Sequence, residues 1–421
     1  MRVLFFSHYF PPEGNAPASR TYENCRRWVE DGHRVTVVTC APNHPSGVLY
    51  PGYDNRWRER EQVDGIEVVR VKTYLAANQG TVRRILNYLS YLASAVLASL
   101  DAERPDVIVA TSPQFFCGWA GVLAARLHRS PLVLEIRDIW PESITAVGAM
   151  RSRPLLRVLE WLELRMYDAA TQIVTVGDGY RRCLLEKGVA GTRISVVMNG
   201  IDRRLFSPRE PDRRLIERLG LVGRFVVSYS GTIGMACGLE VVLDAAAELN
   251  ARGRREVVFL LVGDGARRES LEREAARRQL DNVRFTGRLD KSQMPAVLAL
   301  SDVCLVHLRR TPLFETVMPS KIFEALGMRR PVIVGVAGDA TRLVERAGAG
   351  IPIVPDDAGQ LVEAVERLAR DAALRERLGR DGERYVITHH DRDALARDYL
   401  DLLARVAAMH GPGASRRGST G

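Results

Sequence analysis

Short runs of apolar residues alternate with segments of helical spacing through the first half of the chain. A short apolar or β-branched run is typical of a buried strand, whereas apolar residues three and four apart predict a helix. Helical spacing covers 19–31 and 81–100. The predicted strands cover 3–7, 34–40, 66–72, 106–110, 132–136, 172–176 and 195–198. This alternation predicts a parallel sheet with helices on both faces.

The pattern stops at the turn-forming segment 199–202 (Asn-Gly-Ile-Asp) and a polar stretch follows it. It then restarts, with predicted strands at 225–230, 257–262, 283–286, 303–307, 331–334 and 350–354. Two Rossmann-like α/β domains facing a cleft are therefore expected, with ligands bound beyond the carboxyl ends of the strands.

The domain boundaries follow from the same pattern. We expect an N-terminal domain at 1–205 and a C-terminal domain at 206–388. A last helix at 389–410 is expected to return to the N-terminal domain. The Gly-, Ser- and Arg-rich tail at 411–421 is expected to be disordered.

Composition agrees with a folded two-domain protein. The chain has 421 residues, of which 46% are hydrophobic and 26% charged, and this length fits two domains of about 200 residues. The six cysteines form no Cys-x-x-Cys pair, so a zinc site or redox dithiol is not expected and a reducing cytoplasm is. The first apolar run is too short for a signal-peptide core.

The net charge of +9 comes almost entirely from arginine, because lysine occurs only at Lys72, Lys187, Lys291 and Lys321. Dispersed arginines are typical of solvated helix faces. The alternative is attraction to anionic lipid or to phosphate-bearing substrates. Nucleic acid is not an expected partner, since no binding module or basic-aromatic stripe is present.

The segment 317–326 carries the strongest local chemical signal. Pro319 and Ser320 suit the start of a helix, whose free N–H groups favour a bound phosphate. Lys321 adds a positive charge for a diphosphate, and Glu324 can accept hydrogen bonds from two ribose hydroxyls. The alternative is an ordinary capped helix in which Lys321 and Glu324 form a local ion pair.

Several motifs in order resemble those of glycosyltransferase family 4, the retaining GT-B enzymes. They are the first loop 9–14 (Tyr-Phe-Pro-Pro-Glu-Gly), the segment 197–202, the strand-loop elements 261–265 and 283–287, and 319–324 (Pro-Ser-Lys-Ile-Phe-Glu). The segment 137–142 (Arg-Asp-Ile-Trp-Pro-Glu) is more narrowly similar to a branch that includes fucosaminyltransferase-like enzymes of surface-polysaccharide synthesis. The likeness covers nearly the whole chain.

The resemblance implies an α/β GT-B fold and a retaining hexosyltransferase. The domain at 1–205 would then bind the acceptor and the domain at 206–388 the donor. The donor would be a UDP-sugar, of N-acetylhexosamine type, and the acceptor a polyprenyl-linked or other saccharide. No Asp-x-Asp arrangement is present, which fits a GT-B enzyme that needs no metal and no cofactor. The implied donor-binding residues are Gly14, Asn15, Gly231, Thr232, Gly263, Thr286, Gly287, Arg288, Thr316, Val317, Ser320, Lys321 and Glu324.

Two departures from the family pattern shift weight onto Lys321. The family's Glu-x(7)-Glu motif places Thr316 where the first glutamate belongs, and Glu315 stands one residue early. Either Glu315, through a bulge, or Thr316 or backbone amides then serve the sugar hydroxyls. The loop 230–238 also lacks the cations that the family often uses to hold the diphosphate, which leaves Lys321 as the candidate.

Asp138 and His8 follow or end predicted strands on the acceptor side. Asp138 is the candidate to orient the acceptor hydroxyl, and an ion pair with Arg137 is the alternative. His8 either contacts a substrate or is a satisfied core histidine. The expected catalytic set is therefore Asp138, Lys321 and Glu315, and Gly14 with Asn15 either approach the donor phosphates or form a plain turn.

The helix at 82–100 gives the clearest hint about the acceptor. Arg83 and Arg84 precede sixteen uncharged residues that include Tyr88 and Tyr91. The segment is short for a membrane span and is diluted by polar residues. It is either a buried helix or a membrane-surface helix that presents a polyprenyl-linked acceptor, and the tyrosines and arginines favour the second interpretation. The expected location is the cytoplasm, with peripheral contact at the inner face of the cell membrane.

Two other functions stay open on the sequence. A nucleotide-sugar epimerase would use the same fold, but its acid/base set cannot be identified. A non-catalytic GT-B subunit that binds nucleotide sugar or glycan is compatible with the incomplete glutamate pair. A dinucleotide oxidoreductase is disfavoured, because no Gly-x-Gly-x-x-Gly follows the first strand.

Overall fold

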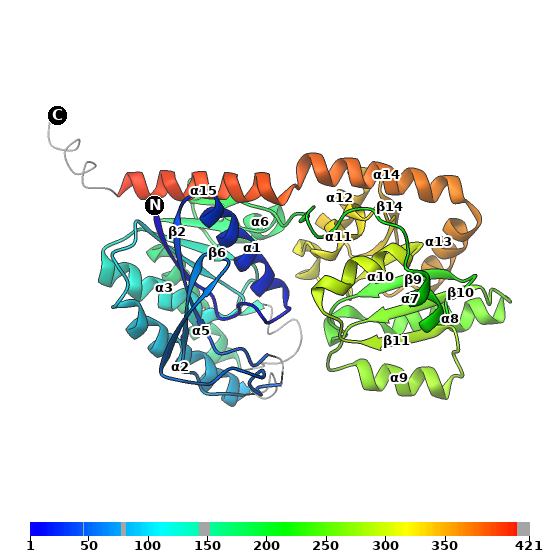
Figure 1. Ribbon diagram of the computed structural model, residues 1–421, viewed down its shortest axis with the longest axis horizontal. Helices are drawn as coiled ribbons and strands as arrows, with labels where there is room; N and C mark the ends of the chain where they lie inside the picture. Colours follow the sequence, from blue (N-terminus) through cyan, green and yellow to red (C-terminus); the bar gives the residue numbers. More distant parts are fainter. Residues whose placement is uncertain (45, 77–80, 143–151, 411–421) are drawn as a thin grey trace. The chain divides into compact units, whose positions relative to one another are not determined.

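The computed structural model describes residues 1–44, 46–76, 81–142 and 152–410 (Figure 1). The chain forms two compact units. Unit 1 consists of Met1–Met198 and the chain from Asp393 onward, and unit 2 consists of Asn199–Arg392. Both are α/β, as expected. The predicted tail at 411–421 lies outside the described residues.

Unit 1 is built on an eight-stranded sheet of order β3-β4-β2-β1-β5-β6-β7-β8. Neighbouring strands are parallel except for β3 and β4, which form an antiparallel hairpin at one edge. The bounds are β1 Arg2–Phe6, β2 Arg34–Cys40, β3 Arg58–Val63, β4 Ile66–Val71, β5 Val107–Thr111, β6 Leu132–Ile136, β7 Gln172–Thr175 and β8 Ile194–Val196.

The apolar pattern did not predict β3. Its sequence, Arg-Glu-Arg-Glu-Gln-Val, is polar on both faces, because an edge strand needs no apolar face. The turn into β4 has positive φ at both Asp64 (47°) and Gly65 (79°), which is the geometry of a type I′ hairpin. The prediction of a purely parallel sheet is therefore wrong at this edge.

The helices of unit 1 fall on the two faces of this sheet. Right-handed crossovers place α1 on one face, because it leads from β1 toward the β3 edge, and α2, α3 and α5 on the other, because they lead toward the β8 edge. The bounds are α1 Ala16–Glu30, α2 Thr81–Ser99, α3 Phe115–His128, α5 Arg153–Ala169, α6 Asp178–Glu186, η1 Gly191–Arg193 and α15 Arg392–Met409.

The last helix, α15, packs against α1 in unit 1. The Trp28 indole Nε1–H donates to the Ala396 carbonyl over 3.0 Å, and the Trp28 and Tyr399 rings meet edge to face at 5.3 Å. One apolar core holds both rings together with residues of β1, β2 and β4. The end of the chain thereby covers the first strands of the sheet.

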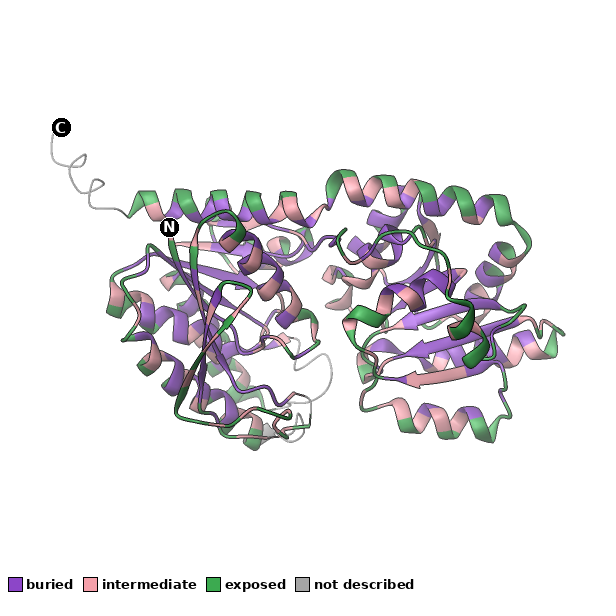
Figure 2. Ribbon diagram, viewed as in Figure 1, coloured by how far each residue is buried: buried purple, intermediate pink, exposed green. Residues whose placement is uncertain are grey.

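Unit 2 has a six-stranded, fully parallel sheet of order β11-β10-β9-β12-β13-β14. Its four central strands are buried, its edge strands β11 and β14 are partly exposed, and its helices expose their outer sides (Figure 2). The strands are β9 Phe225–Ser230, β10 Val257–Val262, β11 Val283–Gly287, β12 Val303–His307, β13 Val332–Gly335 and β14 Gly350–Pro352. The helices are α7 Arg213–Arg218, η2 Met235–Cys237, α8 Glu240–Ala251, α9 Arg268–Arg277, η3 Lys291–Gln293, α10 Met294–Leu300, η4 Phe314–Thr316, α11 Lys321–Gly327, α12 Asp339–Ala347, α13 Ala358–Arg370 and α14 Ala372–His389.

The boundary between the units lies at 198/199 rather than at 205/206, and unit 2 extends to Arg392 rather than to 388. The reason is a pairing between the two connecting segments. The Ile201 N–H donates to the His390 carbonyl over 2.8 Å, and the Arg392 N–H donates to the Ile201 carbonyl over 3.1 Å. Ile201 is fully buried against Gly327 of α11. Both connections therefore belong to unit 2.

Among the described helices, none combines the length and apolar character that a membrane crossing requires.

Candidate functional site

Three glycines connect the carboxyl ends of β9, β10 and β11 through backbone hydrogen bonds. The Gly231 N–H donates to the Val262 carbonyl and the Gly263 N–H to the Gly287 carbonyl, each over 2.9 Å. Gly263 has φ +146°, and a Cβ there would collide with the carbonyl oxygen of Gly231. Only glycine permits this approach. The strand ends therefore form a low backbone surface without side chains, as a bound phosphate or nucleotide requires.

Lys321 reaches this backbone surface from the segment that follows the neighbouring strand, β12. The strand order reverses between β9 and β12, and this topological switch point is where open α/β sheets bind ligands. The Lys321 ammonium lies 3.8 Å from the centre of the Tyr229 ring, and a Cβ built on Gly231 would lie 3.0 Å from Nζ. Lys321, from the segment after β12, thus meets Gly231, from the loop after β9.

The charges of Lys321 and Glu324 are not neutralised by each other. Within the described residues, neither side chain has a hydrogen bond or a salt bridge, and both are half-buried. Burial lowers the pKa of Lys321, against the nearby Glu324 carboxylate, which raises it. Burial likewise raises the pKa of Glu324, against Lys291 and Lys321. The local ion pair that the sequence left open is therefore not formed, and both groups are available to a ligand.

The start of α11 differs from the expected cap. The Ser320 side chain makes no capping hydrogen bond. The Ile322 N–H donates to the Pro319 carbonyl over 3.2 Å, and the Phe323 N–H to the Ser320 carbonyl over 3.1 Å. The amides of Ser320 and Lys321 have no acceptor in the described part of the chain. Ser320 therefore contributes through its backbone rather than as a side-chain cap.

The segment of Glu315 and Thr316 forms the short 3₁₀ helix η4. The Glu315 side chain is exposed, and the Thr316 hydroxyl donates to the Leu313 carbonyl over 2.7 Å. Any Cβ on Gly338 (φ +83°) would collide with the Glu315 carbonyl, so α12 packs closely under this turn. Val317 is half-buried directly after η4.

The loop after β9 acquires two arginines from other segments. Arg309 Nε donates to the Met235 carbonyl over 2.8 Å, and both Arg309 and Arg267 form salt bridges with Glu240, over 2.9 and 2.5 Å. The sequence could not show this, because the arginines lie far from the loop in the chain. Their charges are engaged with Glu240, so they hold the loop in place. Thr232 is exposed in the same loop.

The remaining predicted donor residues of unit 2 lie at the end of β11 or directly after it. The Thr286 hydroxyl donates to the Gly287 carbonyl over 2.9 Å, and Arg288 is exposed. Tyr229, which lies under Lys321, was missed by the sequence reasoning. An aromatic residue in a buried strand reads as ordinary core, and only the strand order shows that Lys321 lies above it.

In unit 1, Asn15 has a structural role. Its side-chain Oδ1 accepts the Ala18 N–H over 2.9 Å and caps α1, which begins directly after the exposed Gly14. Arg137, in the loop after β6, reaches the same helix start, since its Nη1 donates to the Pro17 carbonyl over 3.3 Å. The loops after β1 and β6 therefore meet at the carboxyl edge of this sheet.

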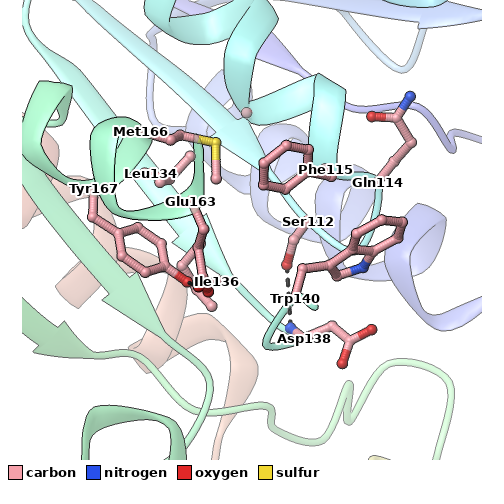
Figure 3. Close-up of a pocket in the computed structure, with 11 residues that line it drawn as sticks. Ser112, Gln114, Phe115, Leu134, Ile136, Asp138, Trp140, Glu163, Met166 and Tyr167 are labelled. Atoms are coloured by element: carbon pink, nitrogen blue, oxygen red, sulfur yellow. Dashed lines mark hydrogen bonds between the residues drawn. The ribbon is translucent and has the colours of Figure 1, made fainter. Parts of the chain in front are cut away.

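Asp138 lies at the rim of a small pocket at this edge (Figure 3). Its N–H donates to Ser112 Oγ over 3.2 Å. The pocket lies between the stacked Phe115 and Trp140 rings and the Tyr167–Glu163 pair. The space that the described residues leave there is about 10 Å³, about the size of one water molecule. As lined by these residues, the pocket is too small for a sugar ring.

His8 belongs to an aromatic cluster at the end of β1. Its ring meets those of Tyr88 and Tyr91 edge to face at 5.6 and 4.9 Å, and its buried Nδ1 has no partner in the described structure. Burial, reinforced by the charge of His44, lowers the pKa of His8 to about 3. His8 is therefore neutral at physiological pH. Tyr88 and Tyr91 point into this core, so their expected role at a membrane surface is wrong.

Across the described ranges, no group of three or more His, Cys, Asp or Glu residues has the arrangement of a metal site. The six cysteines are all free thiols.

Family models decide what this arrangement belongs to. Residues 15–200 match the model of the glycosyl transferase 4-like domain, and residues 224–371 match that of the glycosyl transferases group 1. The chain belongs to glycosyltransferase family 4. The protein is therefore a glycosyltransferase with the GT-B fold, and its two matched domains correspond to the two units of the structure.

Similar curated proteins are glycosyltransferases as well. The putative colanic acid biosynthesis glycosyl transferase WcaI of Escherichia coli K12 is 26% identical over 337 residues, which is 78% of this chain and 81% of that protein. The UDP-Gal:α-D-GlcNAc-diphosphoundecaprenol α-1,3-galactosyltransferase of Escherichia coli is 25% identical over 279 residues, which is 65% of this chain and 69% of that protein.

Solved structures share the fold. Sucrose-phosphate synthase from Thermosynechococcus elongatus aligns with a TM-score of 0.76 at 18% identity, over 97% of this chain and 99% of that one. HepE from Anabaena, solved in complex with UDP and glucose, aligns with a TM-score of 0.70 at 19% identity, over 96% and 99% of the two chains.

Proposed function

We propose that this glycosyltransferase moves a sugar of N-acetylhexosamine type from a UDP donor to a lipid-linked saccharide, with retention of configuration, in surface-polysaccharide synthesis. One observation carries the donor half of the proposal. The ammonium of Lys321 lies at the switch point beside Gly231 and forms no salt bridge within the described residues, so a diphosphate would supply its counter-ion. The names of the similar proteins support the donor class and the lipid-linked acceptor.

The chemistry assigned to the chain is stabilisation of the leaving group. As the bond between the anomeric carbon and the diphosphate oxygen breaks, negative charge develops on the diphosphate and positive charge on the sugar. Lys321 and the free amides at the start of α11 offset the first of these charges. The acceptor oxygen bonds to the anomeric carbon from the face that the diphosphate leaves, and its proton passes to the diphosphate. Asp138 is assigned to orient that acceptor hydroxyl.

Glu324 and the three glycines bind the nucleoside part of the donor. The Glu324 carboxylate, one helical turn after Lys321, accepts from the ribose hydroxyls. The surface formed by Gly231, Gly263 and Gly287 lacks side chains and allows the donor to approach the protein backbone closely. Thr286 and Arg288 are assigned to the base. The proposal assigns charge neutralisation to Lys321 rather than to a metal ion, so addition of EDTA is expected to leave the rate unchanged.

A donor screen tests the proposal. The protein is incubated with UDP- and GDP-linked sugars, and slow donor hydrolysis is followed together with the anomer of the released sugar by NMR. We expect turnover of a UDP-N-acetylhexosamine and an α-anomer released first from an α-linked donor. Binding of the donor without any turnover would instead support a non-catalytic subunit, and inversion at C2 without transfer would support an epimerase.

Asp138→Asn tests the acceptor half. Transfer to a lipid-linked saccharide is expected to slow, whereas donor affinity is retained, because Asp138 is assigned to the acceptor. Asp168→Asn, an exposed change on α5, is the matched control. Equal transfer rates for Asp138→Asn and the parent would remove Asp138 from the mechanism.

A further inference from the structure

Helices α2, α3 and α5 lie side by side on one face of unit 1 (Figure 1). These helices expose many apolar side chains. Among the described residues, eighteen large apolar side chains are exposed, and ten of these lie on the three helices or directly after α2. A surface in water scatters such residues singly, whereas a gathering of this kind marks an interaction site.

The outward leucines of α2 follow helical spacing. Tyr88 and Tyr91, which turn toward the sheet, are 7% and 0% exposed, whereas Leu89 and Leu97 are 40% and 49% exposed. The steps between exposed leucines fit one stripe along the helix. We call the following set the leucine face: Leu86, Leu89, Leu97, Leu100, Leu123 and Leu127.

The contributions of α2 and α3 to the leucine face lie next to each other. The Cys117 Sγ–H donates to the Tyr91 hydroxyl over 3.8 Å, and His128 Nε2 lies 2.9 Å from the Ser99 carbonyl oxygen. The residue numbers at these two contacts increase in the same direction along both helices, so α2 and α3 are parallel. The second half of α2 therefore lies level with the second half of α3, and their exposed leucines form one continuous surface.

The charges that α2 and α3 themselves carry are all positive, and Asp101, directly after Leu100, forms a salt bridge with Arg58. Neither α2 nor α3 contains an aspartate or glutamate, whereas they carry Arg83, Arg84 and Arg126. Arginines beside an apolar stripe are the pattern of a helix that lies in the interface of an anionic membrane. On α5, Trp161 is exposed with Arg165 5.7 Å from its ring, but Glu160 and Asp168 are exposed on the same helix, so only α2 and α3 carry positive charge alone.

We propose that the leucine face docks on the surface of an anionic lipid bilayer. The leucines enter the boundary between headgroups and acyl chains, and the arginines bind lipid phosphates. The N-terminal half of α2 packs beside His8 at the carboxyl edge of the unit 1 sheet, so docking brings this edge to the height of the headgroups. The inference rests on unit 1 alone and requires no donor chemistry.

Flotation with lipid vesicles tests the docking. The full chain is mixed with vesicles of phosphatidylcholine alone, or of equal parts of phosphatidylcholine and phosphatidylglycerol, and recovered after centrifugation. We expect flotation with the second composition only, weakening as salt is raised. No flotation of the parent with the anionic vesicles would overturn the proposal.

Two sets of variants locate the contact. Leu86→Gln/Leu97→Gln/Leu127→Gln is expected to lower the partition coefficient about a hundredfold, from the loss of three inserted side chains. Val48→Gln/Val222→Gln/Val354→Gln, which changes exposed valines elsewhere, is the matched control and should float like the parent. Equal flotation of the leucine variant and this control would refute the assignment.

Arg83→Gln/Arg126→Gln is expected to lower the partition coefficient about twentyfold. Its control, Arg213→Gln/Arg218→Gln on α7, makes the same change of net charge in unit 2 and should retain flotation. Equal losses in both would show attraction by net charge alone. Sedimentation velocity tests whether the leucine face instead binds a second copy of the chain. If the parent is a dimer that the leucine variant converts to a monomer, with flotation unchanged, the membrane proposal would be overturned. Donor hydrolysis by these variants is expected to match the parent, so failure of the docking leaves the proposed function untouched.

Discussion

The substitution Lys321→Met separates a donor-binding lysine from a structural one. Methionine keeps the length and apolar stem of the side chain and removes only the charge. Because burial lowers the pKa of Lys321 and its side chain forms no salt bridge within the described residues, we expect the folded protein without donor not to depend on this ammonium. The variant should therefore be as stable as the parent, or more stable, in the absence of donor.

Donor binding should respond in the opposite direction. A charge-assisted hydrogen bond contributes about 1.5–3 kcal/mol, which corresponds to a dissociation constant about 10- to 100-fold higher in the variant. At a donor concentration of about 100 times the parent Kd, the parent gains about 2.7 kcal/mol. With a Kd about 30-fold weaker, the variant gains about 0.9 kcal/mol at the same concentration.

Differential scanning fluorimetry measures both effects. At about 2–4 °C per kcal/mol for a domain of this size, the donor should raise the Tm of the parent by about 5–10 °C and that of the variant by about 2–4 °C. Lys72→Met, which alters an exposed lysine of unit 1, is the control and should keep the parent's shift. A variant that is destabilised without donor, yet retains the full donor shift, would refute the reasoning and make Lys321 a structural residue.

Three further changes test other parts of the structure. Glu324→Gln is expected to raise the donor Kd about tenfold by calorimetry, with exposed Glu363→Gln as control. Because burial raises the pKa of Glu324, the donor affinity of the parent should fall on acidification at a higher pH than it would with an ordinary glutamate, whereas the affinity of the variant should not change with pH. A parent affinity that does not change with pH would exclude the Glu324 carboxylate from the donor contact. Gly263→Ala should lower the free energy of unfolding by at least about 2 kcal/mol in urea, because Cβ meets the Gly231 carbonyl, whereas Gly253→Ala, with open space around it, should cost about 1 kcal/mol from its positive φ alone. His8 stays neutral in the fold down to a pKa of about 3 but takes up a proton at about pH 6.5 when unfolded, so the fold loses about 1.4 kcal/mol per pH unit between these values. His8→Asn removes this loss, and its unfolding free energy relative to the parent should improve by about 2 kcal/mol from pH 7 to pH 5; an unchanged difference would contradict a neutral His8.

The sequence predicted the parallel strands well because each is a continuous buried run of apolar and β-branched residues. It failed where a strand needs no apolar face, as in β3, and where a boundary depends on pairing between distant segments, as between Ile201 and His390. Periodicity reports local burial, and neither an edge strand nor a long-range bridge leaves that signal.

The same distinction applies to the candidate site. Lys321 and Glu324 were identified from one short segment, because the start of a helix carries its chemistry locally. Tyr229 and the engagement of Arg309 and Arg267 with Glu240 depend on which strand ends meet, which only the sheet order shows. In α2 the orientation of Tyr88 and Tyr91 could not be read, because sixteen uncharged residues leave the inward face of a helix undefined.

Fewer groups now remain as candidates for the role of the missing first glutamate. The sequence left Glu315, Thr316 and backbone amides as alternatives for the sugar hydroxyls. The Thr316 N–H donates to the Leu313 carbonyl over 3.1 Å and the Val317 N–H to the Phe314 carbonyl over 3.2 Å, so these two amides are already used inside the turn. The close approach of Gly338 prevents the turn from opening without displacing α12. The acceptors that this turn still offers a sugar are the exposed Glu315 carboxylate and the lone pairs of the Thr316 hydroxyl, whose own proton is bound to Leu313. If the proposed donor binds as inferred, its sugar hydroxyls would be held here by side-chain acceptors and its diphosphate by Lys321.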